Sequence, residues 1–429
     1  MSVPTALEGP LGFNVLGYLS GNLGLAVAAR NSLAMLLERG ERVAVFDFDA
    51  GRGRSGHDRS FLHLVRRIQQ APFGINLFHL NPPDIVYFLA DHERRLRLSR
   101  RLNVCVPFWE LPRLPERPWV SVLESCDLVL APSKFVAAAV RTSAPRARVV
   151  HYPQSVLLPD GVGANRSRWA LPAEATTFLV TLDLGSDIDR KNPFAAISAF
   201  EQAFGRDRAA HLVIKLNNAR MSVRLRQRAL ELVTRVSRSP NVTVVNESLS
   251  YRDVISLYAS CDVLVSLHRS EGLGLHMLEC MALAKPVIAT RWGGNLDFMD
   301  ERCAALIDYD LVPVRSEHDC YRREVIGPGQ VWAEPDLAQA AAAMAALADD
   351  AQRSAELGAR ARAAYLETRR VFLDNPAIET VIRAWRSTRS RGGDHAVRAA
   401  ALSAARKLGP YRRTRRIAAR VLRRLRPRR

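Results

Sequence analysis

The chain has 429 residues, of which 48% are hydrophobic and 24% charged, so it can form two ordinary domains with their own cores. This composition excludes a mainly disordered, collagen-like or coiled-coil protein. The formal net charge is +19, but residues 386–429 hold 16 Lys and Arg against one acidic residue, and the rest carries only +4. The sequence therefore predicts a nearly neutral body followed by a basic tail.

The cysteines and the apolar segments indicate the compartment. None of the six cysteines forms a C-x-x-C pair, and most lie in apolar or helix-like stretches, as expected for buried thiols rather than disulfides or a zinc site. No basic segment followed by an apolar one occurs in residues 1–12, and no stretch approaches 18 uninterrupted apolar residues. We therefore expect a soluble, cytoplasmic protein without a signal peptide or transmembrane span.

Short apolar runs alternate with amphipathic segments of helical length in the first half of the chain. This alternation is typical of βαβ units, which form parallel sheets covered by helices on both faces. The predicted elements are a helix over 25–39 and strands over 13–18, 43–48, 75–79, 103–108, 128–131 and 148–152.

After a loop rich in Gly, Pro and Asn that ends near residue 172, the alternation begins again. Strands are predicted over 177–182, 210–216, 241–245, 263–267 and 286–289, and helices over 193–204, 223–236, 251–259, 275–284 and 337–368, the last as one or two helices. We expect a first domain over 1–165, a second over 172–368, a closing helical segment over 369–385 and the basic tail over 386–429. Ligands would bind in the cleft between the domains, beyond the carboxyl ends of the strands.

The most informative window runs from residue 263 to residue 300. A predicted strand is followed by a loop that contains Glu271, Gly272 and Gly274, and a helix begins at Leu275. Unpaired amides and a positive dipole at a helix start suit a phosphate, and Glu279, one turn into this helix, is near enough to accept hydrogen bonds from ligand hydroxyls. The pattern therefore favours a ligand with both hydroxyls and a diphosphate, such as a sugar nucleotide. The spacing alone equally allows a capping Glu271 and a solvated Glu279.

The sequence of this window resembles the E-x7-E signature of the retaining glycosyltransferases of family 4 (group 1). That resemblance implies the GT-B fold, in which two Rossmann-like, doubly wound domains face each other across a cleft. It also implies that Glu271 contacts the donor sugar, that Glu279 holds the ribose hydroxyls, and that the loop amides meet the diphosphate. The loop residues concerned are Gly272, Leu273, Gly274 and Leu275.

The resemblance covers roughly residues 13 to 368 and includes a basic turn over 189–193. A growing charge on the leaving nucleoside diphosphate is stabilised by cations that already point at it. Lys191, with Arg190 beside it, is the first candidate for this role, and Lys215 at a predicted strand end is the second. Many family members carry an arginine where this chain has Gly185, so Arg190 or another cation must replace it. The alternative is an exposed charge pair at residues 190 and 191. Asn295 belongs to a further family-like segment and is a donor-side candidate.

The first domain offers candidates for the opposite side of the cleft. Gly21, Asn22 and Gly24 follow the first predicted strand, in a spacing that is not G-x-G-x-x-G and so disfavours a dinucleotide-binding dehydrogenase. These glycines allow close approach of a ligand, although a plain tight turn before a helix is equally compatible. Trp109 and Glu110 follow another strand, where related enzymes carry polar residues that face the acceptor. The histidine often seen in this region of the family is missing, so no catalytic base is named.

The tail residues 412–429 combine arginines with an apolar stripe at helical spacing. Such a helix can lie on an anionic membrane, at the inner face of which a lipid-linked acceptor would be found. A solvated cationic tail is an equal alternative. No nucleic-acid partner is expected, because no aromatic platform accompanies the arginines.

We therefore expect a retaining, metal-independent hexosyltransferase without a bound cofactor. It would move a sugar from a nucleotide to a glycan or lipid-linked acceptor in cell-envelope or exopolysaccharide synthesis, with GDP-mannose the first candidate donor. A GT-B epimerase or phosphorylase is the second enzyme class. A catalytically silent protein that binds sugar nucleotides or membranes is the alternative outside enzymes.

Overall fold

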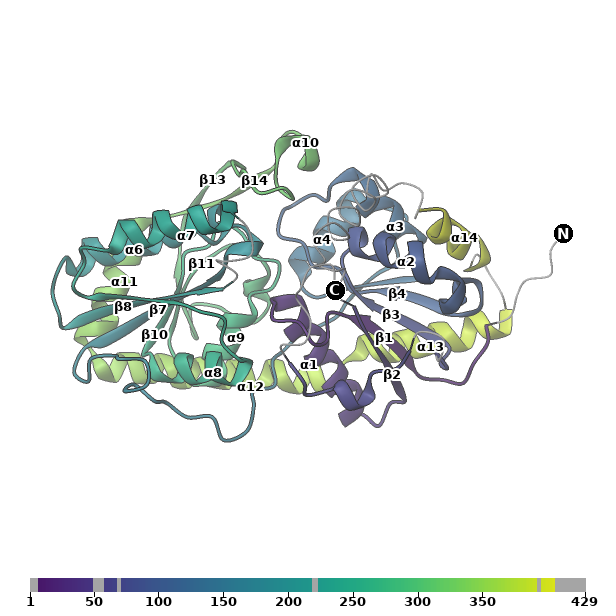
Figure 1. Cartoon of the computed structure of the whole chain (residues 1–429), viewed down its shortest axis with the longest axis horizontal. Coiled ribbons are helices and arrows are strands. Elements are labelled where there is room, and N and C mark those ends of the chain that lie inside the picture. Colours follow the sequence, from purple (N-terminus) through teal and green to yellow (C-terminus); the bar gives the residue numbers. More distant parts are fainter. Residues whose placement is uncertain (1–6, 49–57, 68–70, 218–222, 392–394, 406–429) are drawn as a thin grey trace, which may run out of the picture.

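The computed structural model describes residues 7–48, 58–67, 71–217, 223–391 and 395–405. Two lobes lie side by side along the long axis of the molecule, each built on a parallel sheet with helices on both faces (Figure 1). Segments 49–57, which follows the second strand, and 406–429, which includes the predicted amphipathic stripe, lie outside the described residues.

The first sheet has six parallel strands in the order β2-β1-β3-β4-β5-β6. Its strands are β1 (Phe13–Gly17), β2 (Val43–Asp47), β3 (Ile75–His79), β4 (Leu102–Cys105), β5 (Leu128–Ala131) and β6 (Val149–His151). The helices that accompany them are α1 (Gly24–Glu38), α2 (Pro82–Leu96), α3 (Ser121–Ser125) and α4 (Lys134–Ser143). The order in which strands are added to the sheet reverses between β1 and β3, so the loops after these two strands diverge and leave a crevice.

The second sheet also has six parallel strands, in the order β12-β11-β10-β7-β8-β9. Its strands are β7 (Thr176–Asp183), β8 (Ala210–Asn217), β9 (Val242–Asn246), β10 (Val263–Ser266), β11 (Val287–Thr290) and β12 (Ala305–Ile307). Its helices are α5 (Ile188–Lys191), α6 (Pro193–Phe204), α7 (Val223–Val236), α8 (Tyr251–Ser260), α9 (Leu275–Ala282) and α11 (Leu337–Asp349). The strand order reverses between β7 and β10, which places their loops together at the cleft.

Most predicted strands agree with the structure to within one residue, and one ends earlier than predicted. The strand predicted over 103–108 stops at Cys105. Val106 still donates its N–H to Phe78, but Pro107 has no N–H, and Phe108 donates to the side chain of Asn81 instead of to a strand. The chain therefore leaves the sheet here and turns toward the second lobe.

The predicted helix over 337–368 is two helices, α11 and α12 (Ala351–Asp374). They divide at Asp350, whose side chain accepts a hydrogen bond from the N–H of Arg353 and caps α12. α12 runs along both lobes in Figure 1, and α13 (Pro376–Arg391) continues beneath the first sheet. The first lobe's core therefore includes residues from the far end of the chain: Phe372, Ala377, Ile378, Val381, Ile382 and Trp385.

The expected closing segment, residues 369–385, packs on the first lobe, and its residues Phe372, Ile378 and Trp385 belong to that lobe's core. The expected tail contains the end of α13 and a further helix, α14 (His395–Ala405), which packs on α3. His395 is buried there, and its Nδ1 donates to the Oδ1 of Asp127 at 2.9 Å.

A hairpin of β13 (Tyr309–Pro313) and β14 (Val331–Pro335) extends from the second lobe. Its connection includes α10 (Arg323–Ile326) and reaches toward the first lobe (Figure 1). Short helical turns complete the fold: η1 (Leu62–Leu64), η3 (Leu98–Arg100), η4 (Glu116–Val120), η5 (Leu184–Ser186) and η6 (Gly294–Asp297).

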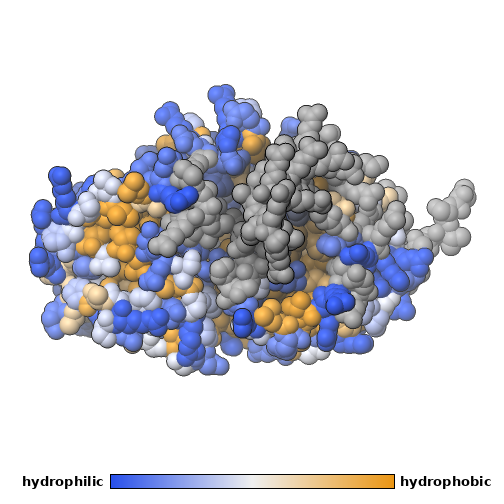
Figure 2. Space-filling view, in the orientation of Figure 1, coloured by the Kyte–Doolittle hydropathy of each residue, from blue (hydrophilic) through white to orange (hydrophobic). Residues whose placement is uncertain are grey.

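Hydrophilic residues cover much of the face drawn in Figure 2, with separate apolar patches on both lobes. Among the described helices, none combines the length and the apolar character needed to cross a membrane.

Candidate functional site

A cavity of about 660 Å³ lies between the two lobes, at the carboxyl ends of both sheets. Thirteen of the fifteen expected site residues line it. From the first lobe these are Asn22, Gly24, Trp109 and Glu110, and from the second they are Arg190, Lys191, Lys215, Glu271, Gly272, Leu273, Gly274, Leu275 and Glu279.

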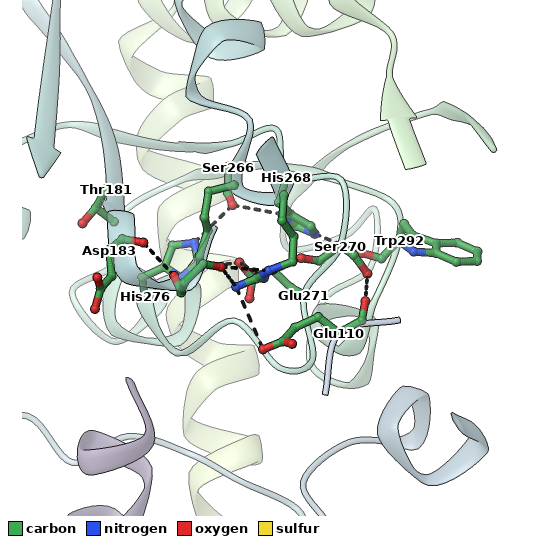
Figure 3. Close-up of polar contacts among 12 residues, drawn as sticks. Glu110, Thr181, Asp183, Ser266, His268, Ser270, Glu271, His276 and Trp292 are labelled. Carbon is green, nitrogen blue, oxygen red and sulfur yellow. Dashed lines mark hydrogen bonds and ion pairs between the residues drawn. The ribbon is translucent and has the colours of Figure 1, made fainter. Parts of the chain in front are cut away.

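Glu271 lies in the loop between β10 and α9, and it is 6% exposed. Its Oε1 is hydrogen-bonded to the Nζ of Lys191 and lies 3.3 Å from the Nη1 of Arg190 (Figure 3). Burial opposes ionisation, but the two cations outweigh it and hold the pKa of Glu271 well below its usual range. Gly274, not Glu271, is the N-cap of α9. The capping interpretation is therefore wrong, and Glu271 is an ionised carboxylate at the cavity wall.

The positions of the two basic residues follow from a sharp turn between α5 and α6. Asn192 ends α5 with φ +51°, a conformation that asparagine tolerates, and Pro193 begins the next helix. Arg190 is 2% exposed and donates to the carbonyl oxygen of Ser270 at 2.7 Å. Its Nη2 donates to the carbonyl oxygen of Ser186 at 2.9 Å. Arg190 is therefore a buried, fixed cation, and the alternative interpretation of an exposed charge pair is wrong for it.

Two glycines allow the lobes to approach each other beside Glu271. A Cβ on Gly272 would lie 2.5 Å from the carbonyl oxygen of Trp109 in the first lobe. A Cβ on Gly294 would lie 2.8 Å from the Oγ of Ser133 in the first lobe, and 2.1 Å from the carbonyl oxygen of Gly272 within its own lobe. Ser133, the N-cap of α4, donates its hydroxyl to that same Gly272 oxygen at 2.6 Å. The loop that carries Glu271 is thus held directly against the first lobe.

Glu279 lies one turn into α9 and is 5% exposed, so the alternative of a solvated helix residue is wrong. The hydroxyl of Tyr251 donates to its Oε1 at 2.9 Å. Burial raises the pKa of Glu279 to about 7, although Tyr251 and the nearby charge of Arg30 act in the opposite direction. This carboxyl group can therefore gain or lose a proton near neutral pH.

Lys215 comes from β8 on the other side of the reversal point. Its Nζ donates to the carbonyl oxygen of Leu216 at 2.7 Å, and burial lowers its pKa to about 8. Asp183 and Glu247 act in the opposite direction. Lys215 is therefore mostly, but not fully, protonated at pH 7.

The first lobe contributes polar contacts across the cavity. The Nδ2 of Asn217 donates to the carbonyl oxygen of Asn22 at 3.2 Å, and Ser270 donates its hydroxyl to the carbonyl oxygen of Glu110 (Figure 3). The carboxylate of Glu110 lies 3.9 Å from the Nη2 of Arg190.

Two expected residues support the wall from behind rather than line it. Gly21 closes the turn after β1, and its carbonyl oxygen accepts from Arg30 at 2.9 Å. Asn295 is fully buried and donates to the carbonyl oxygen of Thr290 at 3.1 Å.

The sequence analysis missed cavity residues that come from the hairpin connection and from the start of α9. Tyr321 lies over Trp109, with ring centroids 5.6 Å apart, and donates its hydroxyl to Glu110. His318, which also lines the cavity, contacts the carbonyl oxygen of Gly185 through Nε2 at 3.2 Å. His276, the second residue of α9, stands inside the motif window and could have been noticed there.

Within the described ranges, no group of three or more His, Cys, Asp or Glu residues is arranged to hold a metal ion. The polar wall of the cavity combines fixed cations, helix-terminal amides and the buried carboxyl groups of Glu271 and Glu279, which suits a ligand with both phosphates and hydroxyls.

Comparison with known proteins agrees with this geometry. Residues 189–313 match the family model described as "Glycosyl transferases group 1". No match is found among curated proteins.

Solved structures are similar over most of the chain at low sequence identity. Sucrose-phosphate synthase from Thermosynechococcus elongatus is 14% identical with a TM-score of 0.63, and the match covers 88% of this chain and 100% of the synthase chain. HepE from Anabaena, in complex with UDP and glucose, is 14% identical with a TM-score of 0.57, over 87% of this chain and 99% of its own. A glycosyltransferase from Rickettsia africae is 13% identical with a TM-score of 0.58, and the match covers 87% of this chain and 97% of the Rickettsia chain. The chain has the GT-B fold, with two facing six-stranded α/β domains.

Proposed function

We propose that this protein is a glycosyltransferase that moves a hexose-type sugar from a nucleoside diphosphate to a glycan or lipid-linked acceptor, with retention of configuration. The observation that carries this proposal is the cluster of Glu271, Lys191 and Arg190 at the cavity wall. This cluster is formed at the strand-order reversal of the second sheet, where sheets of this kind bind ligands. The match to group 1 glycosyltransferases includes all three residues.

Each residue has a role in this proposal. Glu271 accepts hydrogen bonds from hydroxyls of the donor sugar, and Glu279 accepts them from the ribose. Lys191 and Arg190 face the diphosphate and stabilise the negative charge that grows on it as the glycosidic bond breaks. Arg190 thereby replaces the arginine that related enzymes carry at the position of Gly185. Because these cations supply the charge stabilisation, the reaction needs no divalent metal.

The acceptor enters from the first lobe, between Trp109, Glu110 and the turn at Asn22. Retention follows from the family resemblance, and the departing phosphate helps to remove the proton of the acceptor hydroxyl on the same face. Similar structures contain UDP or UDP-glucose, which makes UDP-sugars the first donors to test beside GDP-mannose. A contact of residues 412–429 with the inner face of a membrane would bring the enzyme to a lipid-linked acceptor.

The test is a panel of UDP-, GDP-, ADP- and dTDP-sugars, with the free diphosphates, read by thermal shift and by release of the nucleoside diphosphate. We expect one nucleotide to stabilise the protein selectively, and the Glu279→Ala variant, which removes the acceptor for the ribose hydroxyls, to lose this response. Selective binding without turnover in the presence of glycan and lipid-linked acceptors would instead indicate a silent binding protein. A folded chain that responds to no nucleotide would contradict the proposal.

A further inference from the structure

A chain of hydrogen bonds runs from the loop after β11 to the cavity wall (Figure 3). The Nε2 of His268 lies 2.9 Å from the carbonyl oxygen of Trp292. The Oγ of Ser266 lies 3.0 Å from the Nδ1 of His268 and 3.1 Å from the Nε2 of His276. Ser266 is the last residue of β10 and His276 is the second of α9, so the chain of bonds joins the strand to the start of the helix behind Glu271.

The direction of each bond follows from what the groups can donate. A carbonyl oxygen only accepts, so the Nε2 of His268 carries a hydrogen. Burial lowers the pKa of His268, so the ring is neutral and its Nδ1 is an acceptor. The hydroxyl hydrogen of Ser266 therefore points to His268, and the Ser266 oxygen accepts from the Nε2 of His276.

His276 is thereby held in one tautomer, with the lone pair on Nδ1. Its charged and titratable neighbours are Lys191, Glu271, His268 and Arg190. Burial, followed by the charge of Lys191, lowers the pKa of His276 to about 3, so the ring stays neutral at physiological pH. Within the described part of the chain, Nδ1 has no hydrogen-bond partner and is not enclosed by protein, and the residue lines the cavity.

An acceptor at this place differs from the groups around it. The amides at the start of α9 and the cations Lys191 and Arg190 all donate, which suits phosphate oxygens. A lone pair would repel a phosphate oxygen but would accept from a hydroxyl. Apart from burial, the largest influences on the His276 ring are the charges of Lys191 and Glu271, which are bonded to each other at the cavity wall. The ring therefore lies near Glu271, to which the proposed function gives the donor sugar.

We propose that His276 is a specificity-determining residue whose Nδ1 accepts a hydrogen bond from a hydroxyl of the transferred sugar, with Ser266 and His268 as positioning residues. This inference rests on the proposed function, because it requires a sugar nucleotide in the cavity. It adds a second contact to the transferred sugar beside that of Glu271, and it comes from a side chain other than the two glutamates of the E-x7-E pattern.

The test compares a sugar nucleotide with its free diphosphate. Dissociation constants for UDP-glucose, UDP, GDP-mannose and GDP are measured by calorimetry on the whole chain for wild type, His276→Leu and His276→Asn. One neutral hydrogen bond corresponds to about a fivefold to tenfold change in affinity. We expect His276→Leu to weaken the affinity for the sugar nucleotide by this factor and to leave the affinity for the free diphosphate unchanged. His276→Asn, whose Oδ1 can replace Nδ1, should stay within about twofold of wild type.

Controls separate this inference from a structural role and from failure of the proposed function. His63→Asn, at an exposed histidine in η1, should change neither constant. Ser266→Ala removes the oxygen that holds His276 in one tautomer, so this variant should also weaken the binding of the sugar nucleotide and not that of the diphosphate. The double variant Ser266→Ala/His276→Leu should bind the sugar nucleotide no more weakly than His276→Leu alone. If His276→Leu does not fold, Ser266→Ala carries the test alone. Equal losses for sugar nucleotide and diphosphate would overturn the inference. Wild type that binds neither would overturn the proposed function and this inference with it.

Discussion

The hydroxyl of Tyr321 donates a hydrogen bond to the carboxylate of Glu110, and this contact joins the hairpin of the second domain to the acceptor side of the first. The same hairpin is attached a second time, because the Nε2 of Gln330 donates to the carbonyl oxygen of Arg113 at 2.8 Å. Ile326 and Trp332 add apolar contacts, since both belong to the first domain's core. The hairpin therefore fastens the two domains together beside the cavity.

The variant Tyr321→Phe removes this bond and keeps the ring against Trp109. Because the bond is to a charged group, we expect a loss of about 1.5–3 kcal/mol in the free energy of unfolding. Tyr309→Phe is the matched control, since the Tyr309 hydroxyl has no hydrogen-bond partner among the described residues. Chemical denaturation of both variants gives the comparison, and an unchanged Tyr321→Phe would show that the contact does not hold the domains.

Glu271→Gln removes the carboxylate that Lys191 and Arg190 share. The two cations are then buried without their partner, so the empty protein should lose about 3–5 kcal/mol. A nucleoside diphosphate can neutralise them, and we expect it to raise the thermal midpoint more in the variant than in wild type. Sugar transfer should fall at least about 100-fold, because the sugar contact is lost.

The control for this variant is Glu231→Gln, which breaks a half-exposed ion pair with Arg228 away from the cavity. Such pairs contribute about 0–1 kcal/mol, so stability and activity should stay close to wild type. Unreduced transfer by Glu271→Gln would contradict the proposed donor site.

The raised pKa of Glu279, about 7, gives the empty protein a pH dependence with a definite sign. A carboxyl group whose pKa is higher in the folded than in the unfolded state stabilises the fold at low pH. This contribution is lost as the pH rises from about 4.5 through 7. Glu279→Gln does not titrate but keeps an acceptor for Tyr251. We therefore expect the variant to become more stable relative to wild type between pH 5 and 8, as measured by thermal denaturation. A constant difference over this range would show that Glu279 is ionised throughout.

Gly272→Ala tests the close contact of the domains beside Glu271. The added Cβ would lie 2.5 Å from the backbone oxygen of Trp109, which cannot move as a flexible side chain can. We expect a cost of about 1–3 kcal/mol and weaker nucleotide binding, since the loop must shift away from the first domain. Gly163→Ala is the control, because a Cβ there meets nothing within 4 Å. Wild-type binding by Gly272→Ala would mean that the domain contact can open without affecting the site.

The cysteines provide a probe of the cavity that requires no activity. All six lie in the described part of the chain; Cys320 lines the cavity and is exposed, and the other five are buried. A reagent that alkylates cysteine thiolates, applied to the native protein, should therefore modify Cys320 first. Bound nucleotide should slow this reaction, and mass spectrometry after peptide digestion measures both effects. Equal rates with and without a nucleotide that binds would place the ligand away from Cys320.

Local patterns predicted the parts of this molecule that depend on neighbouring residues in the chain. The loop from Ser266 to Leu275 follows a strand and precedes a helix, so its position at the sheet edge could be inferred from spacing. The partner of its carboxylate, Lys191, is 80 residues away and was proposed only because both sites resemble the same family. Burial of Arg190 and Glu279 could not be predicted, because it depends on how the two domains meet.

The hairpin and the final helices show the same limit. Residues 314–330 carry no helical or strand period that would connect them to the cavity, yet Tyr321 reaches it through the antiparallel pair β13 and β14. For α13, the amphipathic pattern predicts a helix but does not say which domain its apolar face covers. Trp385 and its neighbours in α13 pack on the first sheet, whereas the earlier helix α11 packs in the core of the second domain.

The return of α12 and α13 has a consequence for biosynthesis. The first domain's core contains Phe372 and Trp385, so this domain stays unfinished while the ribosome makes the second domain. The Nε1 and Cε2 atoms of Trp385 lie 2.2 and 2.8 Å from where a Cβ on Gly74 would be, which shows how closely the late segment fits the early one. The second domain's core ends with Leu357, Ala361 and Tyr365 of α12, so it can form before Phe372 and Trp385 are added, and the N-terminal half then folds around the arriving helix.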